Sequence, residues 1–180
     1  KSDSVFEDVL AGAGIDAVKI GMLSTAEIIS TVAESLRKWK PAIIVLDPVM
    51  ISKSGCALLQ EDAVQALKNE LLPLASLITP NVPEAEVLAG IKIVTKDDMR
   101  KAAEILLATG TKAVLLKGGH CEEHADDLLF SAEQELWLKG ERIESRNTHG
   151  TGCTLSSAIT ALLAREYSLE ESCREGKAFV

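Results

Sequence analysis

Short, wholly apolar runs that alternate with longer amphipathic stretches are the feature that most restricts how this chain can fold. Ile43–Leu46 and Ala113–Leu116 contain no polar residue, and such runs are typical of strands buried on both faces of a sheet. Ala17–Ile20 and Leu77–Thr79 are predicted as two further strands. The alternation of strands with helical stretches predicts an α/β domain with a largely parallel sheet.

Helix-start signals separate the predicted strands. Ser24–Glu27 fits the capping-box pattern and is predicted to open a helix to about Lys38. Thr95–Asp98 is predicted to open another helix, and Ser168–Glu171 is predicted to cap the last one. A hairpin is predicted to join strands at 135–138 and 142–145. The other helices are expected over the opening segment, residues 61–71, the segment that contains Pro83, and residues 153–165.

The composition is that of an ordinary globular protein, and we expect one domain over residues 1–180. Hydrophobic residues make up 47% of the chain and charged residues 26%. No apolar run approaches the roughly 18 residues that a membrane span needs. A formal net charge of −8 and an aromatic content of 3% disfavour binding to nucleic acid or to anionic membranes. A cytoplasmic location is the default expectation.

The cysteine pattern favours free thiols. The spacing is wide and irregular, without a CxxC pair, so neither a disulfide framework nor a zinc site is expected. The segment His120–His124 is interpreted as a solvated loop rather than a metal cluster. The four cysteines are Cys56, Cys121, Cys153 and Cys173.

Polar residues that suit phosphate and metal chemistry follow three of the predicted strands. Asp47 follows the second strand, Asn81 and Glu84 the third, and Lys117 with Gly119 the fourth. Parallel sheets bind ligands beyond the carboxyl ends of their strands, where a lysine can neutralise phosphate and carboxylates can hold Mg²⁺. Each residue also fits a simpler role, since Asp47 can form a turn and Glu84 can cap a helix.

The segment 147–154 is the most informative stretch of the sequence. Gly150 and Gly152 flank Thr151 immediately before an apolar helix, and Cys153 stands at the helix start. Glycines let backbone N–H groups turn toward a ligand, and the positive end of a helix favours an anion such as a transferring phosphoryl group. A plain glycine turn before a helix is the alternative. The segment is not a P-loop, because GxxxxGK[ST] is absent.

Taken together, these segments resemble the hydroxymethylpyrimidine and phosphomethylpyrimidine kinases, a branch of the ribokinase-like superfamily. The resemblance implies a three-layer α-β-α fold with a central, mostly parallel sheet. It also implies ATP-dependent phosphorylation of 4-amino-5-hydroxymethyl-2-methylpyrimidine and of its monophosphate for thiamine synthesis, with Mg²⁺ as cofactor, in a homodimer. The matching segments are residues 17–23, 46–55, 71–88, 113–120 and 147–159.

The resemblance further implies roles for individual residues. Cys153 occupies the place where most ribokinase-like enzymes have a catalytic aspartate, and it completes an anion hole with Gly150, Thr151 and Gly152. The carboxylates implied at the metal site are Asp47 and Glu84. The implied ATP contacts are Lys117, Gly119, Asn81, Thr148 and His149. The residues implied to line the pyrimidine pocket are Met22 and Val49.

The family's glycine-rich, pyrimidine-binding N-terminal segment has no counterpart in this sequence. We therefore expect a fragment that lacks this part and a portion of a C-terminal helix. Pyridoxal kinase activity is the alternative within the superfamily, although residues 49–55 look more like the pyrimidine enzymes. A non-catalytic ligand-sensing domain on the same fold would be expected to lose Lys117, Glu84 or Cys153, and all three are present.

Overall fold

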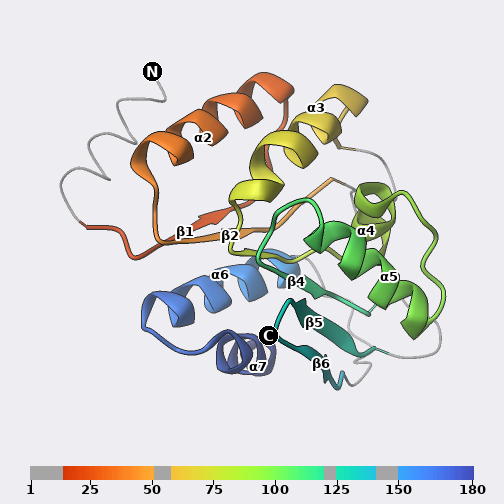
Figure 1. The fold of residues 1–180 in the computed structure, drawn as a ribbon. Helices are drawn as coiled ribbons and strands as arrows, with labels where there is room; N and C mark the ends of the chain where they lie inside the picture. Colours follow the sequence, from red (N-terminus) through yellow and green to blue (C-terminus); the bar gives the residue numbers. More distant parts are fainter. Residues whose placement is uncertain (1–13, 51–57, 120–124, 141–149) are drawn as a thin grey trace.

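A six-stranded sheet lies at the centre of the computed structural model, which describes residues 14–50, 58–119, 125–140 and 150–180 (Figure 1). The strands lie in the sheet in chain order. The first four pair in parallel, and β5 runs antiparallel to both β4 and β6. The predicted α/β class with a mostly parallel sheet is confirmed. The strands are β1 Ala17–Ile20, β2 Ile43–Leu46, β3 Leu77–Ile78, β4 Ala113–Leu116, β5 Asp127–Ser131 and β6 Glu135–Leu138.

The antiparallel end of the sheet differs from the sequence-based expectation. The partner of β6 within the described residues is β5, with Leu128 opposite Trp137, whereas the partner predicted at 142–145 lies outside the described residues. The strand β5 was not predicted, because its apolar run of Leu128 to Phe130 is short and follows two aspartates, which are depleted in strands. Leu128 and Leu129 are buried on opposite faces of the sheet, under the two helix layers, which no local pattern reveals.

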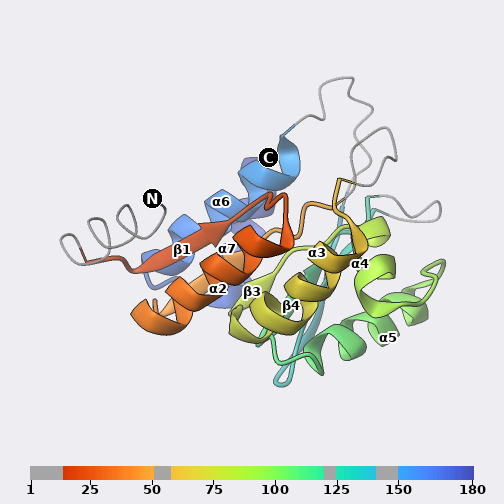
Figure 2. The same ribbon diagram turned by 90° about the horizontal axis from the view of Figure 1, so that it is seen from above.

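Helices cover both faces of the sheet, so the expected three layers are present (Figure 1). Among the described residues, one face is covered by four helices, where α2 packs against α3 and α4 against α5 (Figure 2). Two helices cover the other face and pack against each other. The first group is α2 Ala26–Trp39, α3 Glu61–Ala66, α4 Val82–Ala89 and α5 Lys96–Leu107, and the second is α6 Thr151–Ala164 and α7 Leu169–Phe179.

The helix starts follow local side-chain chemistry. The helix starts predicted at Thr95 and Ser168 are confirmed, and in both α5 and α7 the start is a reciprocal capping box. The capping box predicted from Ser24 to Glu27 is wrong. Thr25 caps α2 by accepting from the Ile28 amide at 3.3 Å, which puts an isoleucine at the third helical position, where it cannot return a hydrogen bond.

Two other helix boundaries also differ from the prediction. The stretch 61–71 is α-helical only to Ala66 and continues as a π-helical turn, Leu67–Leu71, before a 3-10 turn that contains Pro73. The helix predicted from Cys153 begins two residues earlier, with Gly150 as its N-cap. The described residues include no helix that is both long enough and apolar enough to cross a bilayer.

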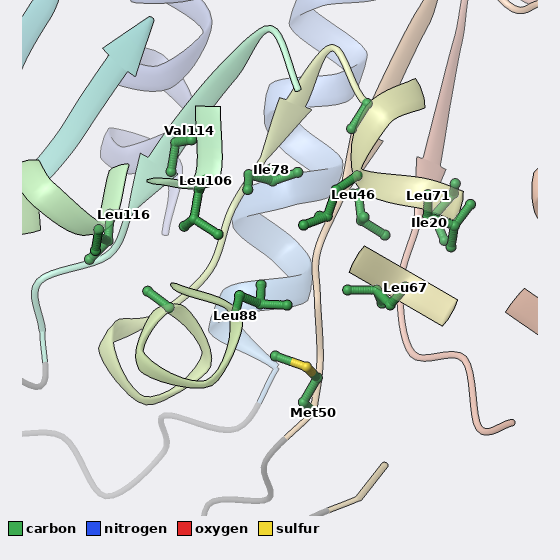
Figure 3. Close-up of a cluster of buried hydrophobic side chains, with 14 of the residues drawn as sticks. Ile20, Leu46, Met50, Leu67, Leu71, Ile78, Leu88, Leu106, Val114 and Leu116 are labelled. Atoms are coloured by element: carbon green, nitrogen blue, oxygen red, sulfur yellow. The ribbon is translucent and has the colours of Figure 1, made fainter. Parts of the chain in front are cut away.

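Strand side chains alternate between two hydrophobic cores. Leu46, Ile78 and Val114 point toward the layer of α2 to α5, where Figure 3 shows them with Leu88 and Leu106 from the helices. Their neighbours along the same strands contact α6 and α7. Every residue of β4 is buried, which is the burial that the uniformly apolar run predicted. The two cores fix the strand register, and with it the edge of the sheet at which the polar residues emerge.

Candidate functional site

The carboxyl ends of the parallel strands place the predicted polar residues side by side. The Asp47 amide donates to Ile20 O at 2.9 Å, and the Lys117 amide donates to Pro80 O at 2.8 Å. Asn81 and Lys117 form an isolated parallel bridge beyond β3 and β4. The backbone ladder therefore continues past the strands and aligns Asp47, Asn81 and Lys117 at one edge of the sheet, as the strand order predicted.

Asp47 is the buried centre of a polar cluster. Its side chain is 2% exposed, and the ammonium of Lys117 lies 3.3 Å from Oδ1. The Thr79 hydroxyl also donates to Oδ1 at 3.2 Å, and the Ser156 hydroxyl of α6 donates to Oδ2 at 3.4 Å. A buried carboxylate requires such partners. Asp47 is therefore more than a turn former, and both of its oxygens hold neighbouring side chains in place.

The first turn of α6 lies beside Lys117. A Cβ added at Gly152 would lie 3.3 Å from Lys117 Nζ, so the ammonium lies close to the backbone of the first helical turn. Gly150 has a φ of 81°, a left-handed conformation that favours glycine, and the bond from Thr154 N to Gly150 O is the first of the helix. The N–H groups of Gly152 and Cys153 precede that bond. Lys117 and the positive helix end converge on one place, which suits an anion.

Glu84 combines the two roles that the sequence left open. Its Oε2 accepts from the Asn81 amide at 2.8 Å while Asn81 Oδ1 accepts from the Glu84 amide at 2.9 Å, which is a capping box for α4. Burial raises the pKa of Glu84, and the charge of Asp47 raises it further. Lys117 and the backbone amides of Asn81 and Met50 oppose that rise. The capping carboxylate therefore also belongs to the electrostatic cluster around Asp47.

The two described cysteines have opposite environments. Cys153 is exposed in the first turn of α6, whereas Cys173 of α7 is buried. Burial, together with the charge of Asp127, raises the pKa of the Cys173 thiol to about 12. The Ser156 hydroxyl lies 3.0 Å from the Cys153 carbonyl oxygen as well as near Asp47, so it ties the first turn of α6 to the buried carboxylate. Cys56 and Cys121 lie outside the described residues.

The remaining predicted residues lie around this cluster or outside the described part of the chain. Met22 is 55% exposed on the segment after β1, next to the edge that carries Asp47. Val49 is half-buried, and its amide donates to Asp47 O at 2.8 Å. Gly119 is exposed two residues after Lys117. Of the residues singled out from the sequence, Thr148, His149 and the loop 120–124 lie outside the described ranges.

The two buried carboxylates offer the hard oxygen ligands that Mg²⁺ prefers. In the described part of the chain, no three His, Cys, Asp or Glu side chains gather as a ready metal site. Asp47 uses both of its oxygens for internal partners, and Glu84 uses Oε2 for the helix cap. This donor set fits an ion that keeps its waters and meets the carboxylates through them.

Sequence reasoning missed three residues that organise the site. Thr79 and Ser156 are partners of Asp47, and Asp127 accepts from the Gly118 amide at 2.8 Å. Ser156 lies one helical turn beyond Cys153, so its position on the same side of α6 was a usable signal. Nothing local marked the other two, because their partners are distant in sequence.

Comparisons with known proteins agree on one family. The family model described as phosphomethylpyrimidine kinase matches residues 3–180. A hydroxymethylpyrimidine/phosphomethylpyrimidine kinase of Streptomyces coelicolor is 44% identical over 177 residues, which are 98% of this chain and 64% of the relative. Two further curated relatives are covered to 66%. The chain thus spans a little under two thirds of the length of these relatives.

Two solved structures extend the comparison to the fold. The crystal structure of phosphomethylpyrimidine kinase from Clostridium difficile is similar with a TM-score of 0.89 at 44% identity, over 98% of this chain and 72% of that one. An ADP complex of Bacillus subtilis pyridoxal kinase has a TM-score of 0.91 at 38% identity, over 99% and 68%. The ribokinase-like arrangement of the strands and helices is therefore shared with both enzymes.

Proposed function

The chain belongs to the phosphomethylpyrimidine kinase family, and on this premise we propose that its full-length protein uses ATP to phosphorylate hydroxymethylpyrimidine and its monophosphate. The observation that carries the proposal is the position of Lys117 Nζ, 3.3 Å from Asp47 Oδ1 and beside Gly152 in the first turn of α6. Phosphoryl transfer is catalysed mainly by positioning and charge stabilisation. A lysine, a helix N-terminus and two carboxylates at one sheet edge supply both.

In this proposal each group has its own task. Lys117 holds the phosphates of ATP, and Asp47 keeps the ammonium of Lys117 in place. The N–H groups of Gly152 and Cys153 face the negative charge that develops on the transferring phosphoryl group. The exposed thiol of Cys153 borders the attacking hydroxyl. In a loose transition state that hydroxyl can lose its proton late, so the thiol need not be a strong base.

We assign the Mg²⁺-binding role to Asp47 and Glu84, which would meet the ion through water. Burial and the charge of Asp47 raise the pKa of Glu84, and a nearby cation would oppose that rise. Bound Mg²⁺ neutralises phosphate charge in phosphoryl transfer. The protein's part is to hold the two carboxylates in place, which Thr79 and Ser156 do for Asp47 and Asn81 does for Glu84.

Pyridoxal phosphorylation is the second candidate. The B. subtilis pyridoxal kinase shares the fold at 38% identity, so the ATP side of the site is compatible with either alcohol. Under both candidates Met22 and Val49 are the proposed contacts to the aromatic substrate. The two candidates differ in the alcohol that is phosphorylated, which is the hydroxymethylpyrimidine in the first and pyridoxal in the second.

The test is ADP release by the full-length protein with ATP and Mg²⁺, measured in parallel with the hydroxymethylpyrimidine, its monophosphate and pyridoxal. Release with the two pyrimidines supports the proposal, whereas release with pyridoxal alone favours the second candidate. Silence with all three refutes both. Lys117→Met should lower kcat/KM for ATP by about 100-fold, and Lys112→Met, at the opposite end of β4 and exposed, should leave it unchanged.

We further propose that the full-length protein is a homodimer and acts in the cytoplasm, where its co-substrate ATP is supplied. Light scattering coupled to size-exclusion chromatography tests the first statement. A monomeric mass at micromolar concentration would contradict it. Cell fractionation with activity measurement tests the second.

A further inference from the structure

Asp127, at the start of β5, connects three separate parts of the fold. Its Oδ1 accepts from the Gly118 amide at 2.8 Å, and its Oδ2 pairs with the Lys177 ammonium at 2.6 Å. Lys177 belongs to α7 and also donates to Leu138 O at the end of β6 at 3.2 Å. One buried carboxylate therefore joins the turn after β4, the end of β6 and the C-terminal helix.

The turn after β4 packs tightly against the backbone that leads into β5. A Cβ added at Gly118 would overlap the carbonyl oxygen of Asp126, with the carbonyl carbon only 2.9 Å away. Gly118 is itself buried, so its N–H needs an acceptor from the protein, because a buried donor left without a partner is destabilising. Asp127 is that acceptor. An apolar side chain of similar size would fill the same space but would leave this N–H unpaired.

The same turn carries Lys117. Its amide donates to Pro80 O at 2.8 Å, and the next amide, that of Gly118, donates to Asp127. The N–H of Lys117 is thus bound to the chain that continues from β3, and the N–H of Gly118 is bound to the first residue of β5. This double anchoring fixes the Cα from which the Lys117 side chain reaches Asp47 and the first turn of α6.

We propose that Asp127 is a positioning residue that sets Lys117 for nucleotide binding through the Gly118 amide, and that Lys177 of α7 serves only as the counter-ion of this buried carboxylate. The inference rests on the proposed kinase function. Neither residue touches the place where the phosphates would lie. A buried ion pair alone adds little net stability over an apolar pair of similar volume, so the acceptor function, not the charge, is the part that matters.

Two double variants of the full-length protein separate acceptor from charge. Asp127→Asn/Lys177→Met removes both charges and keeps an oxygen for the Gly118 N–H, whereas Asp127→Leu/Lys177→Met removes the charges and the acceptor. The measurement is the Kd of ADP with Mg²⁺ by calorimetry, with thermal unfolding followed in parallel. We expect the Asn variant to bind within about threefold of the wild type and the Leu variant to bind about tenfold or more weakly.

Equal ADP affinity of the two folded double variants would overturn the positioning role. If the Leu variant does not fold, Asp127→Ala/Lys177→Met lacks the acceptor without adding a branched side chain and serves the same comparison. A steady-state readout must agree: the KM for ATP should rise in the variant without the acceptor, while the KM for the alcohol stays constant. A wild type that binds no ADP would instead refute the kinase proposal itself, and the inference with it.

Discussion

Replacing Gly118 by alanine should be among the most disruptive single-methyl changes in this protein. The added Cβ would overlap the carbonyl oxygen of Asp126 and crowd its carbonyl carbon, and these are backbone atoms that cannot rotate away. Overpacking of this kind costs about 1–3 kcal/mol. A shift of the turn would also weaken the bond from Gly118 N to Asp127, which is worth about 1.5–3 kcal/mol because its acceptor is charged. We therefore expect Gly118→Ala to lower the free energy of unfolding by about 3 kcal/mol.

Gly119 provides the matched control, because the same change one residue later meets no atom within 4 Å and no left-handed backbone. Gly119→Ala should change the free energy of unfolding by less than about 0.5 kcal/mol. Urea denaturation of the full-length protein measures both values. Similar stabilities for the two variants would refute the reasoning, since the two changes differ only in the space that the methyl group meets.

Four other results are expected. Burial raises the pKa of Glu84, so this carboxyl stabilises the fold at pH values below its ordinary pKa of 4.5, and that contribution is lost as pH rises through the raised pKa. Glu84→Gln should therefore flatten this part of a profile of unfolding free energy against pH. An unchanged profile would contradict the assignment. Iodoacetamide followed by peptide mass spectrometry should label exposed Cys153 but not buried Cys173, and Cys153→Ala should lower turnover by about 100-fold; nearly intact turnover would reduce Cys153 to a pocket wall. Thr95→Ala removes the cap of α5 and should lower the free energy of unfolding by about 1 kcal/mol, whereas Thr95→Ser, which keeps the hydroxyl, should not.

Local sequence determined the elements whose stability depends on near neighbours. The strands predicted at 17–20, 43–46 and 113–116 are β1, β2 and β4 with the observed bounds, and the helix starts predicted at Thr95 and Ser168 are those of α5 and α7. Such signals work because a fully buried strand needs apolar residues on both faces, and a helix start needs a side-chain acceptor three residues before its partner. The boundary of α6 was missed by two residues, since Gly150 caps through its left-handed backbone rather than through a side chain.

The order of strands along the chain also predicted that Asp47, Asn81 and Lys117 lie at one sheet edge, because parallel strands end together. The residues that hold this group could not be found in the same way. Thr79 and Ser156 reach Asp47 from 32 and 109 residues away, and Asp127 reaches Gly118 from a strand that was not predicted.

The sequence by itself therefore determined the fold class, the parallel part of the sheet and the identity of the residues with phosphate and metal chemistry. Only the tertiary structure decided that Asp47 is buried with both oxygens engaged, that Glu84 caps α4 while sharing the charge cluster, and that Asp127 connects α7 to the turn of Lys117. The physical reason is the separation along the chain over which each interaction acts. Hydrogen-bonding patterns along the backbone are set within a few residues, whereas the burial and pairing of a charge depend on which distant elements pack over it.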